Sequence, residues 1–394
     1  MTPAALDRSA AVEAAPTPAR RPRIAIFGGK DYPSRGGTGR VVESTLRQLA
    51  GRYDFTVYAY ASPQAEAHLA GVRVVQFPER RAGGAGVFLY LARCLFHALR
   101  QDYDLVHVHK TDAAFALPLL ALRFPCVATS HERAYLNSKW SALGRLYFRL
   151  AERVFVRARA RRTAVSREQA EYYRARYGRT VEHVPNGVEP LAFDEEAAGR
   201  LLAGAGVRGD YLLFAARRVI PLKGLHTLLA ALRALEFRGT LVVLGDLEQM
   251  PEYTAEVRAA ARGLDVHFLG YVAERATLLA LVRRAGAFLF PSEREGMSMM
   301  LLEAAACGTP VLCSDIQANA DVLEPAECVR FRVGDARDLA QRLGWLLEHP
   351  EEARARAARA AEAVEARFGA RAVAERYARL YDEVLAGRAA AAPR

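Results

Sequence analysis

Short apolar segments alternate with longer amphipathic segments along most of the chain. The short ones are rich in β-branched and aromatic residues, as β-strands are, and the longer ones have the periodicity of helices. The strand candidates are 24–29, 55–60, 72–77, 105–109, 126–130 and 163–166, followed by 211–217, 240–246, 266–272, 287–292 and 310–315. Regular alternation of strand and helix predicts parallel sheets with helices on both faces, so the expected fold class is α/β.

The strand candidates form two sets, which predicts two domains. A chain of 394 residues is long for one core, so two domains of similar size are also the natural expectation from length. Turn-forming residues at 184–188 (Val-Pro-Asn-Gly-Val) precede a polar, acidic stretch, which places the linker near 186–208. We therefore expect an N-terminal domain over 22–190 and a C-terminal domain over 191–369, with ligands bound beyond the carboxyl ends of the strands.

The start of the chain and the cysteines indicate where the protein works. Residues 1–21 are rich in Ala and Pro, carry charges and lack an apolar stretch, which predicts a disordered tail and not a signal peptide. No segment approaches the roughly 18 consecutive apolar residues of a membrane-spanning helix. The five cysteines form no Cys-x-x-Cys pair and lie mostly in apolar segments. We expect a cytoplasmic protein with free thiols and no zinc site.

Positive charge is concentrated in the N-terminal half. The formal net charge is +11, and residues 131–180 contain thirteen Arg or Lys against four Glu, which is 13 − 4 = +9 for that segment. Such a surface would attract an anionic partner, and four classes of partner fit it: a phospholipid surface, a lipid diphosphate, an acidic polysaccharide or a nucleic acid.

A helix expected from Trp140 to about Arg162 carries part of this charge in a regular pattern. Four arginines, the arginine stripe, recur every fourth residue, and an apolar stripe lies beside them. The arginine stripe is Arg145, Arg149, Arg153 and Arg157, and the apolar stripe is Leu143, Leu146, Tyr147, Leu150 and Val154. One interpretation is a core helix whose apolar stripe is buried and whose arginines are solvated. The other is a helix that docks on anionic lipid or on a lipid-diphosphate acceptor.

The segment 290–311 carries the strongest chemical signal. It joins a buried strand to a helix through a glycine, with Glu295 in the loop and Glu303 about two turns along the helix. Two carboxylates so placed could contact different parts of one extended ligand, while the backbone amides of Met297, Ser298 and Met299 would face an anion.

Together with its flanking sequence, this segment resembles the E-x7-E signature of retaining glycosyltransferases of the GT-B fold, in particular family 4, the glycosyl transferases group 1. The resemblance covers about residues 23–388. Its other landmarks follow in order: Gly36-Gly37-Thr38-Gly39, the junction at 184–188, Arg218 with Lys223-Gly224, Leu269-Gly270-Tyr271-Val272, and the stretch 305–311. The resemblance implies two Rossmann-like domains facing a central cleft, and a last helix, 370–388, that returns to the N-terminal domain.

The resemblance also implies roles for individual residues. Arg218, Lys223 and Gly37, with the amides of 297–299, would bind the donor diphosphate, and a guanidinium beside an ammonium suits that group. The nucleoside would be bound by Glu303, Tyr271 and Val272. The catalytic residues would be Glu295, which orients the transferred sugar, and His131, which follows a strand in Thr129-Ser130-His131-Glu132.

Two further patterns suggest metal binding but are better explained otherwise. Asp102-Tyr103-Asp104 precedes a strand, at the end of the sheet away from ligands, and reads as a turn. His107 and His109 share a strand face without a third ligand at metal spacing, and a buried strand end explains them better. We therefore expect no metal site and no cofactor.

The sequence as a whole favours a retaining, metal-independent glycosyltransferase. Its donor would be a nucleotide-diphosphate sugar, and its acceptor an anionic or lipid-linked glycan, a polysaccharide or a glycolipid precursor, with peripheral contact to an anionic membrane. One alternative is a sugar-nucleotide epimerase or a phosphorylase on the same scaffold. Another is a basic membrane- or RNA-binding protein, although no RNA-binding signature occurs and no nucleic-acid partner is expected.

Overall fold

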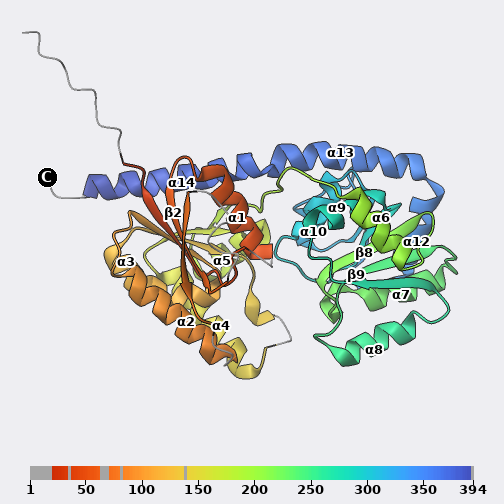
Figure 1. Cartoon of the computed structure of the whole chain (residues 1–394), viewed down its shortest axis with the longest axis horizontal. Coiled ribbons are helices and arrows are strands. Elements are labelled where there is room, and N and C mark those ends of the chain that lie inside the picture. The colour runs from red at the N-terminus through yellow and green to blue at the C-terminus, as the bar shows by residue number, and fades with distance from the viewer. Residues whose placement is uncertain (1–19, 34–36, 63–70, 80–82, 137–139, 392–394) are drawn as a thin grey trace, which may run out of the picture.

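The structure, a computed structural model, describes residues 20–33, 37–62, 71–79, 83–136 and 140–391. Two α/β domains lie side by side, and the last two helices run along both of them (Figure 1). The expected disordered tail, 1–21, lies outside the described residues except for its last two. One of these, Arg20, is ion-paired with Asp104 at 2.9 Å.

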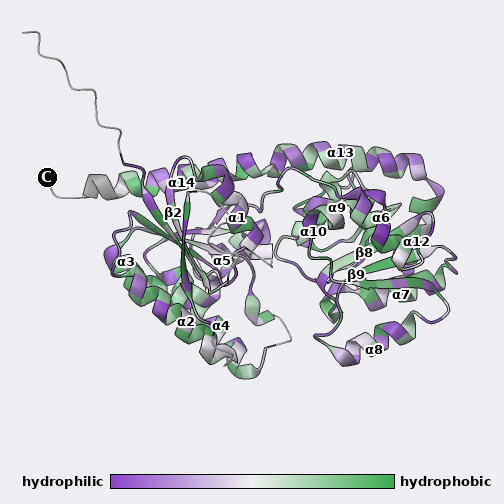
Figure 2. Cartoon of the chain, viewed as in Figure 1, coloured by the Kyte–Doolittle hydropathy of each residue, from purple (hydrophilic) through white to green (hydrophobic). Residues whose placement is uncertain are grey.

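The N-terminal domain is built on a sheet of seven parallel strands in the order β3-β2-β1-β4-β5-β6-β7. The strands are β1 (Arg23–Phe27), β2 (Asp54–Tyr60), β3 (Val72–Phe77), β4 (Leu105–His109), β5 (Cys126–Ser130), β6 (Arg161–Ala164) and β7 (Glu182–His183). The helices are α1 (Gly37–Leu49), α2 (Gly83–Ala98), η1 (Thr111–Ala116), α3 (Leu117–Arg123), η2 (Ala134–Leu136), α4 (Ala142–Arg157) and α5 (Arg167–Tyr177). Helices cover both faces of the central strands (Figure 2), so every residue of β4 and β5 is buried.

The C-terminal domain repeats this design with six parallel strands in the order β10-β9-β8-β11-β12-β13. The strands are β8 (Tyr211–Arg218), β9 (Thr240–Asp246), β10 (Asp265–Gly270), β11 (Ala287–Phe290), β12 (Val311–Ser314) and β13 (Val329–Phe331). The helices are α6 (Glu195–Gly204), η3 (Pro221–Lys223), α7 (Leu225–Ala234), α8 (Pro251–Ala260), α9 (Arg275–Arg284), α10 (Met299–Ala306), α11 (Gln317–Ala320), α12 (Ala336–Glu348), α13 (Pro350–Phe368) and α14 (Ala370–Ala391).

The predicted α/β class with two parallel sheets is confirmed. All eleven strand candidates overlap observed strands, and two short strands, β7 and β13, were not predicted. These two have two and three residues, and each pairs with one neighbour at an edge of its sheet. Segments this short carry no readable alternation of apolar and polar positions.

The linker prediction was partly wrong, because much of 186–208 is helical. The Asp194 side chain accepts a hydrogen bond from the backbone N–H of Ala197 and begins α6, and two glutamates occupy the first turn. Ala198 and Leu202 of this helix are buried in the core of the C-terminal domain. The acidic stretch that suggested a polar linker is therefore the N-terminal turn of a packed helix.

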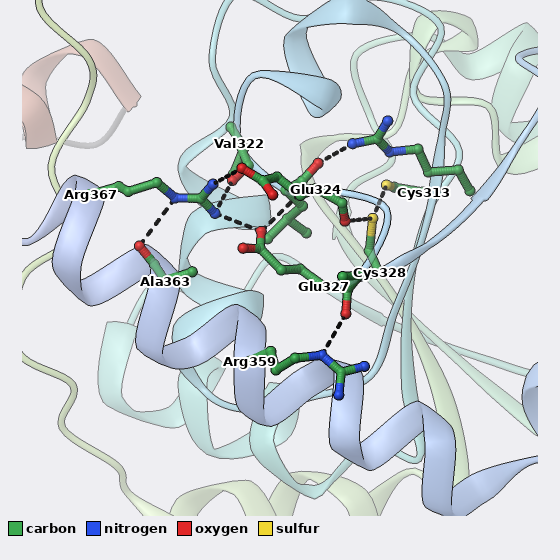
Figure 3. A network of polar contacts seen from close by, with 11 residues as sticks. Cys313, Val322, Glu324, Glu327, Cys328, Arg359, Ala363 and Arg367 are labelled. Atoms are coloured by element: carbon green, nitrogen blue, oxygen red, sulfur yellow. Dashed lines mark hydrogen bonds and ion pairs between the residues drawn. The ribbon is translucent and has the colours of Figure 1, made fainter.

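The last two helices join the domains. α13 is held on the C-terminal domain by Arg367, which donates hydrogen bonds to the Val322 carbonyl at 3.1 Å and to Glu327 at 2.6 Å (Figure 3). The free thiols of Cys313 and Cys328 are buried in the same region, 3.9 Å apart. α14 then packs against α1, β4 and β5 of the N-terminal domain. No helix within the described part of the chain is long and apolar enough to cross a membrane.

Helix α4 differs from its prediction in length and in orientation. It ends at Arg157, because Ala158 takes an extended conformation and Arg161 and Arg162 already belong to β6. Its buried face is Phe148, Ala151, Glu152, Phe155 and Val156. Leu143, Leu146, Tyr147 and Leu150 of the predicted apolar stripe are exposed instead. The core-helix interpretation of that stripe is therefore wrong for these four residues.

Candidate functional site

The carboxyl ends of the two sheets meet where the loop after β11 touches the loop after β5. A Cβ atom placed on Gly296 would lie 2.3 Å from the backbone oxygen of His131, so only glycine permits this approach. Close by, the Arg294 guanidinium donates to the Leu136 carbonyl at 2.7 Å. The structure thus brings Glu295, beside Gly296, and His131 to the same place from different domains.

A close approach between two loops of the C-terminal domain positions Lys223. Gly224 has a positive φ of 71°, and a Cβ there would lie 2.1 Å from the Pro291 oxygen, so the η3 loop lies directly on the end of β11. The Glu293 N–H also donates to the Leu222 carbonyl at 2.9 Å. As a result, Lys223 Nζ donates to Glu295 Oε1 at 2.6 Å, and both side chains are largely shielded from solvent.

Glu303 lies on α10 and is completely buried, with two arginines as partners. Arg40, from α1 of the N-terminal domain, contacts its two oxygens at 2.9 and 3.2 Å. Arg275, the first residue of α9, donates from Nε to Oε1 at 2.8 Å. The Arg40 and Arg275 side chains are 30% and 27% exposed, whereas the carboxylate that they neutralise is 1% exposed. Neither arginine was predicted, although Arg40 follows the glycine-rich landmark directly.

The start of α10 is held by the interdomain junction. The Asn186 side-chain amide donates to the Met297 carbonyl at 3.0 Å, and the Asn186 N–H contacts the Met297 sulfur at 3.1 Å. The Ser298 hydroxyl caps α10 by accepting from the Leu301 N–H at 3.3 Å. Met297 and Met299 are buried in a core cluster that also contains Val41 and Val165 of the N-terminal domain. The side chains of 297–299 therefore fix the loop, which leaves backbone amides as its means of contacting a ligand.

The other predicted donor-site residues lie at the same edges. Arg218 ends β8, and its guanidinium is 3.5 Å from the Gln249 side-chain oxygen. Gly37 is the exposed first residue of α1, and Gly36 of the same landmark lies outside the described residues. After β10, Tyr271 is half exposed, whereas Val272 packs against the domain core. None of these contacts joins Arg218, Gly37 or Tyr271 to the Lys223–Glu295 pair.

His131 is the last of three buried histidines, the histidine row, formed with His107 and His109. His131 Nε2 lies 3.1 Å from His109 Nδ1, and the Gln169 side-chain amide donates to the His131 carbonyl at 3.2 Å. Burial lowers the pKa of His131 well below 6.5, and His109 and Lys110 lower it further. Burial also lowers the pKa of His109 to about 3. The row is therefore uncharged at neutral pH.

The two patterns that suggested a metal have other partners. Asp102 is paired with Arg123 at 3.1 Å, and Asp104 accepts from the Arg23 N–H at 2.8 Å, both at the amino end of β4. Within the residues that the structure describes, no group of three His, Cys, Asp or Glu side chains could hold a metal ion.

A separate feature lies on the outer side of the N-terminal domain, where α2, α3 and α4 lie together (Figure 2). These helices expose apolar side chains. We call it the outer apolar surface. It consists of Phe88, Leu89, Phe96, Leu119, Leu122, Leu143, Leu146, Tyr147 and Leu150. Between α3 and α4 it includes a groove of about 700 Å³, lined by Leu122, Leu150 and Val154 together with Arg153, Arg157 and Arg159. Exposed apolar and cationic groups thus alternate on one surface.

Two family descriptions match the chain. Glycosyl transferases group 1 matches residues 206–364, and Glycosyltransferase Family 4 matches residues 35–190. Phosphatidyl-myo-inositol mannosyltransferase of Mycolicibacterium smegmatis is 31% identical over 293 residues, which cover 72% of each chain. D-inositol 3-phosphate glycosyltransferase of Xylanimonas cellulosilytica is 30% identical over 401 residues, covering 89% of this chain and 94% of the relative.

Solved structures share the fold. Sucrose-phosphate synthase from Thermosynechococcus elongatus superposes with a TM-score of 0.77 at 20% identity, covering 93% of this chain and all of that one. The Anabaena protein HepE in complex with UDP and glucose has a TM-score of 0.75 at 19% identity, covering 92% of this chain and all of that one. At these identities the likeness concerns the fold, which is GT-B.

Proposed function

Because the chain belongs to the group 1 glycosyltransferases, we propose that it transfers a sugar from a nucleotide-diphosphate sugar to a hydroxyl group of its acceptor, with retention of anomeric configuration. The observation that carries this proposal is the close approach of Gly296 to the backbone oxygen of His131, next to the Lys223–Glu295 pair. The loop that carries Glu295, paired with Lys223, thus lies against the backbone of His131 from the other domain.

The proposed reaction uses charge that develops on the leaving group. Lys223 and Arg218 would bind the diphosphate, and negative charge increases there as the bond to the sugar breaks. Lys223 would exchange its contact with Glu295 for the diphosphate, which frees Glu295 to orient the sugar. The acceptor hydroxyl would then attack from the face that the diphosphate leaves. These cations supply the stabilisation that a metal ion gives in other transferases, so we propose a metal-independent reaction.

The nucleoside would be bound by helix α10, which follows the Glu295 loop, and by the residues after β10. Glu303 would accept hydrogen bonds from the two ribose hydroxyls, with Val272 and Tyr271 near the base. In the structure both Glu303 oxygens contact arginines. Ribose must therefore displace or share one of them. Arg40 belongs to the other domain, so we propose that it gives way while Arg275 stays in place.

For the acceptor we propose an anionic or lipid-linked glycan, reached at a membrane surface. The outer apolar surface exposes nine large apolar side chains beside the arginine stripe, a combination typical of segments that bind anionic lipid. Large contiguous apolar patches are rare on soluble monomers and mark interaction sites. The names of two relatives, phosphatidyl-myo-inositol mannosyltransferase and D-inositol 3-phosphate glycosyltransferase, agree with an acceptor that carries phosphate.

The test is an incubation of the full chain with a panel of nucleotide sugars and bacterial lipid extract, followed by mass spectrometry and NMR of the product. A new glycoside with the anomeric configuration of the donor is the expected result. An inverted product would contradict the retaining mechanism. An epimerised nucleotide sugar without a glycoside would support the epimerase alternative, and phosphate-dependent release of a sugar phosphate would support a phosphorylase.

A further inference from the structure

The histidine row connects the interdomain contact to the last helix of the chain, and the proposed function uses only one of its members, His131. We infer that His109 is a positioning residue for sugar transfer, holding the ring of His131 in one orientation and one tautomer through a direct hydrogen bond between the rings. This inference rests on the proposed function and on the expected role of His131 as a catalytic residue.

The contact between the two rings is specific. His109 Nδ1 and His131 Nε2 are 3.1 Å apart, and the rings are stacked at 30° with centroids 5.4 Å apart. Both side chains are buried, so no water competes for these nitrogens. With Nε2 occupied, Nδ1 is the only ring nitrogen through which His131 could contact a ligand.

Two neutral histidines joined in this way share a single ring proton between the bonded nitrogens. If His109 donates from Nδ1, then His131 carries its proton on Nδ1 and acts as a donor toward a ligand. If His131 donates from Nε2, its Nδ1 becomes an acceptor. A proton on both bonded nitrogens would place two N–H groups against each other. Whether His131 is a donor or an acceptor in the site is therefore linked to the tautomer of His109.

His109 is itself fixed from behind. Its ring lies against that of His107, with centroids 3.9 Å apart and an angle of 35° between the planes. His107 uses both nitrogens, since Nδ1 is 2.7 Å from the Tyr381 hydroxyl of α14 and Nε2 is 2.7 Å from the Thr129 hydroxyl. The ring of His109 cannot turn without disturbing this buried stack. The position of His131 thus depends on contacts that extend to α14.

The charges around the row favour its neutral form. Lys110 follows His109 directly and lowers the pKa of both His109 and His131. Tyr377 and Tyr381 of α14 also pack on His107 and have raised pKa values, so they remain neutral. No carboxylate among the described residues is ion-paired with any member of the row. Protonation therefore breaks the arrangement, because nothing compensates the added charge.

The test compares two substitutions of His109. His109→Phe keeps an aromatic ring but cannot bond to His131, whereas His109→Asn retains a polar group near the position of Nδ1. We expect His109→Phe to lower kcat about tenfold to a hundredfold with donor KM little changed, as misplacement of a reacting group does. His109→Asn should recover much of this loss. The acidic limb of the kcat profile should move to higher pH in His109→Phe, because one neighbouring histidine that disfavours protonation of His131 is gone.

A matched control is His97→Phe, which removes another ring hydrogen bond of the same domain, from His97 Nδ1 to the Tyr58 hydroxyl at 3.0 Å. It should leave kcat and its pH profile unchanged. Combining His109→Phe with His131→Ala separates positioning from general stability. If His109 acts through His131, the double variant is no slower than His131→Ala alone. A further loss in the double variant would show a merely structural role and overturn the inference.

A spectroscopic readout keeps the inference testable if no substrate is turned over. Ring 15N–1H NMR of histidine-labelled protein, assigned with His131→Ala, reports the tautomer of His131. A single neutral tautomer in the wild type that is lost in His109→Phe and kept in His109→Asn would support the inference. Identical His131 signals in wild type and His109→Phe would overturn it. Absence of glycoside product with this tautomer intact would count against the proposed function alone.

Discussion

Replacing Lys223 tests the donor site most directly, because this residue has one role in the free protein and a second role in the proposed reaction. Lys223 Nζ is 2.6 Å from Glu295 Oε1, with the two side chains 23% and 11% exposed. At an effective dielectric constant of about 20, two charges about 4 Å apart attract by about 4 kcal/mol before desolvation is counted. Exposed pairs contribute about 0–1 kcal/mol, and breaking a buried pair costs about 3–5 kcal/mol.

The Lys223–Glu295 pair lies between these limits, so Lys223→Ala should lower the free energy of unfolding by about 2 kcal/mol and Tm by several degrees. Adding Glu295→Gln to Lys223→Ala should restore most of the lost stability, because no unpaired carboxylate remains. As a control, Arg342→Ala removes an exposed ion pair with Asp338 of the same domain and should change Tm little.

Turnover should behave differently from stability. If the ammonium meets the leaving diphosphate, Lys223→Ala removes a contact that strengthens in the transition state, so kcat falls more than donor affinity does. The expected loss is about 3 kcal/mol, or roughly a hundredfold. Lys223→Arg should recover only part of the lost turnover, since a planar guanidinium does not fit a site that holds a compact ammonium. The assays are initial rates of glycoside formation, and thermal shift with a panel of nucleoside diphosphates.

Two results would refute this reasoning. Near-normal turnover of Lys223→Ala would make Lys223 a structural partner of Glu295 only. Recovery of turnover in Lys223→Ala with Glu295→Gln would show that the lysine serves to neutralise the carboxylate and does not contact the diphosphate.

Activity should persist in excess EDTA, because the proposed cations take the place of a metal; loss of activity that manganese or magnesium restores would contradict this. Changing the four residues of the arginine stripe to Gln should weaken binding to anionic vesicles by about 1 kcal/mol per residue at low salt. Nucleotide affinity should not change. Equal vesicle binding by the variant and the wild type would favour a purely solvated stripe. Gly224→Ala should lower both Tm and turnover because its Cβ would meet Pro291, whereas Gly263→Ala, with a similar positive φ but open space, serves as the control for backbone strain alone. Arg40→Ala should leave nucleoside diphosphate affinity equal or higher, because ribose no longer competes with it for Glu303; a clear loss would show that Arg40 helps to bind the donor. Below about pH 6.5 the histidines of the unfolded chain gain protons, whereas the buried histidine row does not, because its pKa values are lowered. The free energy of unfolding should therefore fall by up to about 1.4 kcal/mol per pH unit for each histidine. A free energy of unfolding that stays constant from pH 7 to 5 would contradict the low pKa values.

The strand segments were predictable because local patterns encode them. Short segments rich in apolar and β-branched residues, such as 105–109 and 126–130, become strands buried on both faces. Helix starts are likewise marked by residue type, since the side chains of Ser141 and Asp194 each cap the helix that follows. The linker error arose at one of these starts, where an acidic first turn looked like polar loop. Position along the chain does not reveal whether Ala198 and Leu202 have a core to pack against.

Residue type and spacing also identified candidates for the site, but not their partners. The sequence placed Lys223 and Glu295 in two loops, and their contact depends on how closely Gly224 lies on Pro291. It did not show that Glu303 is held by Arg40 and Arg275, because these residues are 263 and 28 positions away from it.

Local periodicity and turn chemistry predict the alternation of strands and helices, the two-sheet architecture and the loops in which charged residues gather. In contrast, tertiary packing selects which face of α4 is buried, and it turned Leu143, Leu146 and Leu150 toward solvent. It also decided that His131 would meet Gly296 from the other domain and His109 from the next strand. Burial and pairing of this kind depend on contacts between distant segments, which no local pattern records.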